Sequence, residues 1–242
     1  LINFSQKNLG LNQRFNMNIS TIMILAAGLG KRMKQYSKKI PKPLIKIGSE
    51  TLIEKIIKKL EINGFRKIVI NIFYLKNKIK KELSNKFKTK IYYSEEKILL
   101  NTGGGIKNAI KILKAKEFFV INSDIIWEEK TISPFDQLNK FWNEDKMDAL
   151  LLLYPKKRNN GDYNINKSNR IVIEKNTPKY IFTGIQILKS KVFLKKKEKI
   201  FSLFSIYEQL IEKKRLFGVI YDGKWFHIGT LESLKEYKKM LQ

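Results

Sequence analysis

After residue 20, short apolar segments alternate with segments of helical periodicity, and this alternation constrains the fold more than any other feature of the sequence. Strands are expected at 21–25, 67–71, 90–94 and 118–122. The segments between them repeat apolar residues at helical spacing, as at Ile53, Ile56, Ile57 and Leu60. Because strands that alternate with helices in this way run parallel, we predict an α/β domain with helices on both faces of its sheet.

The second half of the chain has closely spaced apolar segments joined by turns such as Asn160-Gly161 and Asp222-Gly223. Further strands are expected at 149–154, 170–174, 181–188, 217–221 and 224–228, and helices at 203–215 and 230–241. Short turns favour antiparallel pairing, so we predict one mixed, mostly parallel sheet in a single domain over residues 17–242. Residues 1–16 are polar and show no pattern, and we expect them to form a flexible N-terminal extension.

The composition excludes several kinds of chemistry. The chain has no cysteine and a single histidine, His227, which rules out disulfides, thiolate zinc sites, a cysteine nucleophile and a multi-histidine metal site. No apolar run approaches the length of about 18 residues that could span a membrane, and the first residues lack the features of a secretory signal. We therefore expect a cytoplasmic protein with no membrane partner.

The net charge of +27 would ordinarily suggest a nucleic-acid or other anionic partner. Nearly all of the basic residues are lysine, however, and they are spread over every expected helix instead of forming one stripe. Lys, Ile and Asn have A/T-rich codons, so mutational drift in an AT-rich genome can supply much of this charge. We therefore do not expect nucleic acid as the main partner, and an anionic small-molecule substrate fits the charge at least as well.

A loop of small residues and cations follows the first expected strand, in the segment ILAAGLGKRM (24–33). Backbone N–H groups approach a phosphate without side-chain obstruction at small residues such as Ala26, Ala27, Gly28 and Gly30. A polyphosphate also requires positive charge. It is supplied by Lys31 and Arg32 in this loop and by Lys42 in the nearby IPKPL segment (40–44). The loop is neither a Walker A motif nor a dinucleotide fingerprint, because Met33 occupies the position of the third glycine. Taken alone, it also fits a tight strand-to-helix turn with solvated cations.

The pairing of L-A-A-G-x-G-x-R with P-K-P-L resembles the signature of the sugar-1-phosphate nucleotidyltransferases. Five further motifs match in the family's order over roughly residues 18–241: Thr102-Gly103-Gly104-Gly105-Ile106, Asn122-Ser123-Asp124, Gly161-Asp162-Tyr163, Phe182-Thr183-Gly184-Ile185 and Trp225-Phe226-His227-Ile228-Gly229-Thr230. Within the family they are most similar to the bacterial uridylyltransferases that act on N-acetylmuramate 1-phosphate. The resemblance implies a three-layer α/β/α, Rossmann-like domain. It also implies that UTP and a sugar 1-phosphate react to give a UDP-sugar and pyrophosphate, in the recycling of cell-wall sugars.

The resemblance also implies roles for individual residues. Arg32 would stabilise charge on the triphosphate and the departing pyrophosphate, and Lys42 would bridge the α-phosphate and the attacking phosphate. The small residues of the first loop, with Lys31, would lie in the nucleotide site. The Thr102–Gly105 loop would contact uracil, since glycines pack closely against a flat base and leave backbone donors free for its edge, and Asn122 would also lie in the nucleotide site. The run also fits a plain glycine-rich helix entry, and Asn101 stands where the family has Glu.

Asp124 follows the expected strand 118–122, at the edge where open α/β sheets place their ligands. A carboxylate there can hold Mg²⁺, with Mn²⁺ as an alternative, against triphosphate oxygens, or it can cap the following turn. By resemblance, the sugar would be contacted by Asp162, Gly184 and Glu174. Asp162 taken alone also fits ordinary turn chemistry.

His227 is the main departure from the family, which has at this position an Asp that completes the metal site. Imidazole is a poor ligand for Mg²⁺ but is acceptable to Mn²⁺ and Zn²⁺. Three interpretations stay open: His227 ligates a softer metal, it hydrogen-bonds a phosphate while Asp124 holds the ion alone, or the site is impaired.

Retention of Arg32, Lys42 and Asp124 favours an active enzyme over a catalytically silent sugar-nucleotide-binding homologue. A thymidylyl-, guanylyl- or cytidylyltransferase for another phosphorylated sugar or alcohol would share the same motifs. We expect UTP and a sugar 1-phosphate as substrates, in a monomer or a small homo-oligomer.

Overall fold

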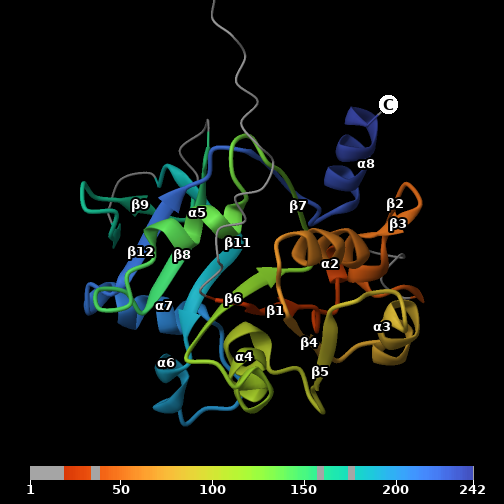
Figure 1. Cartoon of the computed structure of the whole chain (residues 1–242), viewed down its shortest axis with the longest axis horizontal. Coiled ribbons are helices and arrows are strands. Elements are labelled where there is room, and N and C mark those ends of the chain that lie inside the picture. The colour runs from red at the N-terminus through yellow and green to blue at the C-terminus, as the bar shows by residue number, and fades with distance from the viewer. Residues whose placement is uncertain (1–18, 34–38, 157–160, 174–177, 242) are drawn as a thin grey trace, which may run out of the picture.

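A seven-stranded sheet forms the centre of the molecule (Figure 1), in a computed structural model that describes residues 19–33, 39–156, 161–173 and 178–241. In spatial order its strands are β12 (Leu216–Ile220), β8 (Ala149–Pro155), β11 (Tyr180–Lys189), β6 (Glu117–Asn122), β1 (Thr21–Leu25), β4 (Lys67–Ile72) and β5 (Lys90–Glu95). β11 runs antiparallel to its neighbours β6 and β8, and all other neighbouring pairs are parallel. The prediction of a mixed, mostly parallel α/β sheet is confirmed.

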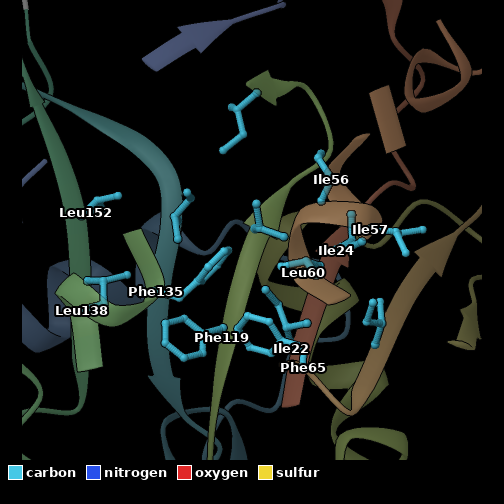
Figure 2. Packing of buried hydrophobic residues seen from close by; sticks show 14 of the residues in the cluster. Ile22, Ile24, Ile56, Ile57, Leu60, Phe65, Phe119, Phe135, Leu138 and Leu152 are labelled. Atoms are coloured by element: carbon cyan, nitrogen blue, oxygen red, sulfur yellow. The ribbon is translucent and has the colours of Figure 1, made fainter. Parts of the chain in front are cut away.

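Helices cover both faces of this sheet because successive residues of a strand point to opposite sides. In β1, Ile22 and Ile24 join a core cluster with residues of α2 (Leu52–Ile62), α3 (Lys76–Leu83) and α5 (Pro134–Phe141), part of which Figure 2 shows. Met23 faces the other way, into a cluster with residues of α4 (Asn101–Leu113), α6 (Lys191–Leu194) and α7 (Phe204–Glu212). The three layers implied by the resemblance are therefore present.

Three two-stranded sheets lie outside the main one: β13 (Lys224–His227) with β7 (Ile125–Glu128), β2 (Lys46–Ile47) with β3 (Glu50–Thr51), and β9 (Asn164–Ile165) with β10 (Ile171–Val172). The prediction that 224–228 extends the main sheet is therefore wrong. Of the described residues in 170–174, only Arg170 pairs with the main sheet, through a single antiparallel bridge to Phe217 of β12. An apolar pattern indicates that a segment is a strand, but it does not identify the partner. The partners here, β7 and β9, are too short to stand out in the sequence.

The last helix, α8 (Leu231–Met240), matches the helix predicted at 230–241, and α7 matches the one predicted at 203–215. The predicted N-terminal extension at 1–16, Asn160 of the Asn-Gly turn and Glu174 lie outside the described residues. Within the described ranges, no helix has the length and apolar character needed to cross a membrane.

Candidate active site

A cavity of about 600 Å³ lies at the carboxyl ends of β1, β4 and β6, which is where open α/β sheets bind their ligands. The described residues that line it are Leu25, Ala26, Ala27, Gly28, Gly30, Lys31, Arg32, Lys42, Pro43, Asn71, Glu96, Leu99, Asn101, Thr102, Asn122, Ser123, Asp124, Ser202 and Gly229. The structure thus brings three predicted parts of the site to one place. They are the predicted phosphate-binding loop (residues 26–32, called the phosphate loop below), Lys42 between its prolines, and the predicted metal ligand Asp124.

The phosphate loop leaves β1 and turns into a 3₁₀ helix, η1 (Lys31–Met33). Gly30 has a φ of 62°, a left-handed conformation that favours glycine, and its carbonyl accepts a 2.8 Å hydrogen bond from the N–H of Met33. The Met33 side chain is fully buried, whereas Lys31 and Arg32 are exposed at the cavity. The turn therefore anchors one side chain in the interior and leaves two cations beside the cavity.

Lys42 lies between two prolines at the start of a second 3₁₀ helix, η2 (Lys42–Leu44), and only 9% of it is exposed. Its Nζ donates a hydrogen bond to Oδ2 of Asp124, in the turn between β6 and β7. Burial by itself raises the pKa of the Asp124 carboxyl, but its contacts with His227 and Lys42 outweigh burial and lower the pKa to about 2. The site therefore holds an ionised carboxylate in direct contact with a largely buried ammonium.

His227 reaches the same carboxylate from the neighbouring strand of the β7–β13 sheet. It stands opposite Ile125 in the ladder, and its Nε2 lies 3.3 Å from Oδ2 of Asp124. The N–H of Ile228 donates to the Asp124 carbonyl over 2.8 Å, which joins the two segments. Gly229 leaves room for the imidazole, because a Cβ there would lie 2.5 Å from Cε1 of His227. The two predicted metal residues are thus adjacent.

These donors suit a divalent ion that is shared with a substrate. In the part of the chain that is described, no group of three His, Cys, Asp or Glu side chains could enclose an ion. Mg²⁺, however, is commonly held by about one or two carboxylates together with substrate phosphates, and Asp124 offers a carboxylate at the cavity. The 3.3 Å between Asp124 Oδ2 and His227 Nε2 is also a separation that two ligands of one ion can have, each about 2.1 Å from it.

The glycine run 103–105 lies in the first turn of α4 and packs against another segment of the chain. The N–H groups of Gly103 and Gly104 both donate to the carbonyl of Phe201, so the expectation that they stay free for a base is wrong. Both glycines are buried, and neither is among the described residues that line the cavity, whereas the neighbouring Thr102 does line it. Of the two interpretations made from sequence, the structure thus agrees with a glycine-rich helix entry.

Gly104→Ala is expected to lower the free energy of unfolding by about 1–3 kcal/mol, because the core there is already filled. A Cβ on Gly104 would lie 2.2 Å from the carbonyl oxygen of Lys199, so the backbone must shift. Thermal unfolding followed by circular dichroism measures the effect. Gly28→Ala is the control, since a Cβ on Gly28 would meet no atom within 4 Å. Equal midpoints for the two variants would contradict the packing role.

Two of the three residues predicted to contact the sugar are described, and neither lines the cavity. Asp162 accepts a 2.8 Å hydrogen bond from the N–H of Phe182 through Oδ2, as the turn interpretation expects. Gly184 has a φ of 87° and packs against Asn122, where a Cβ would lie 2.7 Å from Nδ2. Glu174 lies outside the described residues. The sugar contacts stay predictions.

Two buried polar residues at the cavity, Asn71 and Glu96, were missed from the sequence. Asn71 accepts a 2.9 Å hydrogen bond from the N–H of Ala26 and donates one of 2.7 Å to Oε1 of Glu96. Oε2 of Glu96 accepts from the N–H of Leu100 over 3.0 Å. Burial raises the pKa of Glu96, and these two hydrogen bonds oppose the rise. Both could have been found from the sequence, because Asn71 ends a predicted parallel strand and Glu96 follows shortly after another, where ligands bind in such sheets.

The fold and this site define a nucleotidyltransferase. The family model described as "Nucleotidyl transferase" matches residues 21–242, and the chain belongs to this family. Its relatives place it among the sugar-1-phosphate nucleotidyltransferases.

N-acetylmuramate alpha-1-phosphate uridylyltransferase of Caulobacter vibrioides is 28% identical over 219 residues, which cover 86% of this chain and 90% of that protein. D-glycero-alpha-D-manno-heptose 1-phosphate guanylyltransferase of Campylobacter jejuni is 36% identical over 107 residues, which cover 44% of this chain and 48% of that protein. Among solved structures, HddC from Yersinia pseudotuberculosis matches with a TM-score of 0.76 at 24% identity, over 93% of this chain and 100% of that chain. At this identity the structural match shows the fold alone.

Proposed function

We propose that the protein joins UTP and a sugar 1-phosphate, N-acetylmuramate 1-phosphate foremost, to give a UDP-sugar and pyrophosphate. The observation that carries the proposal is the meeting of the phosphate loop, Lys42 and Asp124 at one cavity. Two relatives that cover most of the chain, from Caulobacter vibrioides and Neisseria meningitidis, are both N-acetylmuramate alpha-1-phosphate uridylyltransferases at 28% identity. They support this base and this sugar.

In this reaction a phosphate oxygen of the sugar 1-phosphate attacks the α-phosphorus of UTP. A new P–O bond forms while the bond from the α-phosphorus to the oxygen that bridges it to the β-phosphorus breaks. The electron pair of that bond leaves with pyrophosphate. Because two phosphates that repel each other must be held in contact, the protein acts mainly through positioning and charge stabilisation.

Lys42 is the residue proposed to bring the two phosphates together. Its ammonium leaves Asp124 and binds the α-phosphate and the attacking phosphate. Since only 9% of Lys42 is exposed, little water screens its charge from a bound phosphate. Arg32, at the exposed edge of the cavity, is proposed to bind the departing pyrophosphate with its planar set of donors.

Asp124 is proposed to hold Mg²⁺ or Mn²⁺, with His227 as a second contact. When bound, the ion neutralises charge on the phosphate oxygens. Oδ2 of Asp124 contacts both Lys42 and His227, so the residues that would hold the ion lie against the lysine proposed to bind the substrate phosphates.

Glu96 is proposed to select the base. A carboxylate only accepts hydrogen bonds, so it pairs with the ring N–H of uracil, thymine or guanine and repels the acceptor nitrogen at the matching position of cytosine. Asn71 and the N–H of Leu100 hold this carboxylate beside the cavity. Guanine satisfies the same carboxylate, and the relative from Campylobacter jejuni is a guanylyltransferase. GTP with a heptose 1-phosphate is therefore the second candidate pair.

Glu96→Gln is expected to reduce the preference for UTP over CTP by roughly tenfold or more, since a hydrogen bond to a charged group contributes about 1.5–3 kcal/mol. The Gln amide supplies both a donor and an acceptor, and so tolerates cytosine. The measurement is the ratio of kcat/KM for the two nucleotides. Glu95→Gln is the matched control, because Glu95 is an adjacent carboxylate paired with Lys76 and Lys80 at the surface. A ratio that stays at the wild-type value in Glu96→Gln would refute the assignment.

The proposed function is tested by pyrophosphate release with four nucleoside triphosphates, each combined with N-acetylmuramate, N-acetylglucosamine, heptose and glucose 1-phosphates. UTP with N-acetylmuramate 1-phosphate is expected to give the highest kcat/KM. A maximum for GTP with the heptose 1-phosphate would instead establish the second candidate. Nucleotide binding without turnover of any pair would show a silent homologue.

A further inference from the structure

A small apolar cluster touches every chain segment that supplies a proposed catalytic or metal-binding group. We call it the C-terminal cluster, and its buried members are Met33, Ile45, Ile47, Leu52, Ile126, Ile228, Leu234 and Tyr237. It is separate from the two clusters that line the faces of the sheet. Each functional residue stands within three positions of a member along the chain: Arg32 beside Met33, Lys42 before Ile45, Asp124 before Ile126 and His227 beside Ile228.

The helix α8 contributes two of these members, Leu234 and Tyr237, and they are 5% and 8% exposed. Tyr237 also packs on Phe226, the residue before His227, with ring centroids 4.9 Å apart. Figure 1 shows α8 near β7 and the β2–β3 hairpin, away from α4, α6 and α7. The helix therefore packs on the segments around the site and not on the main body of the sheet.

The start of α8 is tied to the site as well. The helix begins right after Gly229, which lines the cavity and faces the His227 ring. Thr230 and Ser233 form a capping box, with 3.2 Å from the Ser233 N–H to Thr230 Oγ1 and 3.0 Å from the Thr230 N–H to Ser233 Oγ. The first turn of α8 is thus closed by its own cap, and that cap begins at the residue after Gly229.

We propose that α8 is a positioning element, in which Leu234 and Tyr237 hold Arg32, Lys42, Asp124 and His227 in their relative places by packing beside them. The inference rests on the proposed function, which gives those four residues their roles. Neither residue of α8 touches the reacting atoms. Their effect is on geometry, and displacements of about 1 Å at a reacting site can cost roughly a hundredfold in rate.

Leu234→Ala tests the proposal, with Leu210→Ala as the matched control. Leu210 is a leucine of similar burial on α7, and it belongs to the cluster of the sheet. At a temperature where circular dichroism shows both variants to be folded, Leu234→Ala is expected to lower kcat about tenfold or more and to change KM for UTP far less. Leu210→Ala is expected to lower the unfolding midpoint and to leave kcat near the wild-type value. Leu234→Met, which keeps the volume, is expected to restore kcat.

His227 supplies a readout that does not depend on turnover. Because it is the only histidine, protein labelled with ¹³C-histidine gives one assigned set of ring signals in an NMR spectrum. At constant pH these signals are expected to shift or broaden in Leu234→Ala and to stay in place in Leu210→Ala. If Leu234→Ala does not fold, Leu234→Val takes its place with the same expected direction.

The outcomes separate this inference from the proposed function. If the wild-type protein turns over no substrate pair, the proposed function fails, and the His227 signals still test the packing of α8. Unmoved signals in Leu234→Ala, or equal losses of kcat in the Leu234 and Leu210 variants, would overturn the positioning role.

Discussion

Lys42→Met is expected to lower kcat by about a hundredfold or more, because each charged group that stabilises such a transition state contributes a few kcal/mol. Methionine keeps most of the aliphatic volume that lies buried between the two prolines and removes only the charge. Pyrophosphate release at saturating substrates measures kcat. Lys46→Met is the matched control, because Lys46 is an exposed lysine of β2 only four residues further along the chain.

The folded state of Lys42→Met has to be verified independently, since the substitution also removes a partner of Asp124. Breaking a buried ion pair at one end costs about 3–5 kcal/mol when the remaining charge stays unpaired. Asp124 keeps its contact with His227, and 17% of its side chain is exposed, so we expect a smaller loss of stability here. A folded Lys42→Met protein with near-normal kcat would remove Lys42 from the mechanism.

The affinity for Mg²⁺ is expected to rise with the number of carboxylates at positions 124 and 227. Asp124→Asn removes the carboxylate from the pair and should lower Mg²⁺-supported turnover about a hundredfold or more, because an amide is a far weaker ligand for this hard cation. His227→Asp adds a carboxylate and should lower the Mg²⁺ concentration required for half-maximal turnover. The wild-type protein lies between the two variants.

A titration of turnover against Mg²⁺ and against Mn²⁺ measures this series. Mn²⁺ accepts nitrogen ligands better than Mg²⁺ does, so its advantage should be largest in the wild-type protein and smallest in His227→Asp. Asp136→Asn serves as a control for the loss of a negative charge, since Asp136 lies in the first turn of α5 and accepts a hydrogen bond from Ser133. If His227→Asp leaves the Mg²⁺ midpoint unchanged and the Mn²⁺ preference is absent, His227 is not a metal contact.

Several parts of the site followed from local patterns in the sequence. The phosphate loop, Lys42 between its prolines and Asp124 after an apolar strand were all predicted and all line the cavity. They could be predicted because glycine permits backbone conformations that other residues avoid, and because a proline or a strand end restricts the backbone wherever it occurs. By contrast, Gly103 and Gly104 were assigned to the base because a glycine run leaves backbone donors free, whereas the structure pairs both donors with Phe201.

The sequence by itself determined the α/β alternation, because periodicity reports which residues of a segment avoid water, and this is a local property. It also predicted that Arg32, Lys42 and Asp124 would share one site, and all three line the same cavity. Only the tertiary structure decided that β13 pairs with β7, that Asn71 holds Glu96 at the cavity, and that α8 packs beside the site. Each of these depends on contacts between segments far apart in the chain. A pattern within one segment carries no record of the partner, since many apolar surfaces of similar size could cover it.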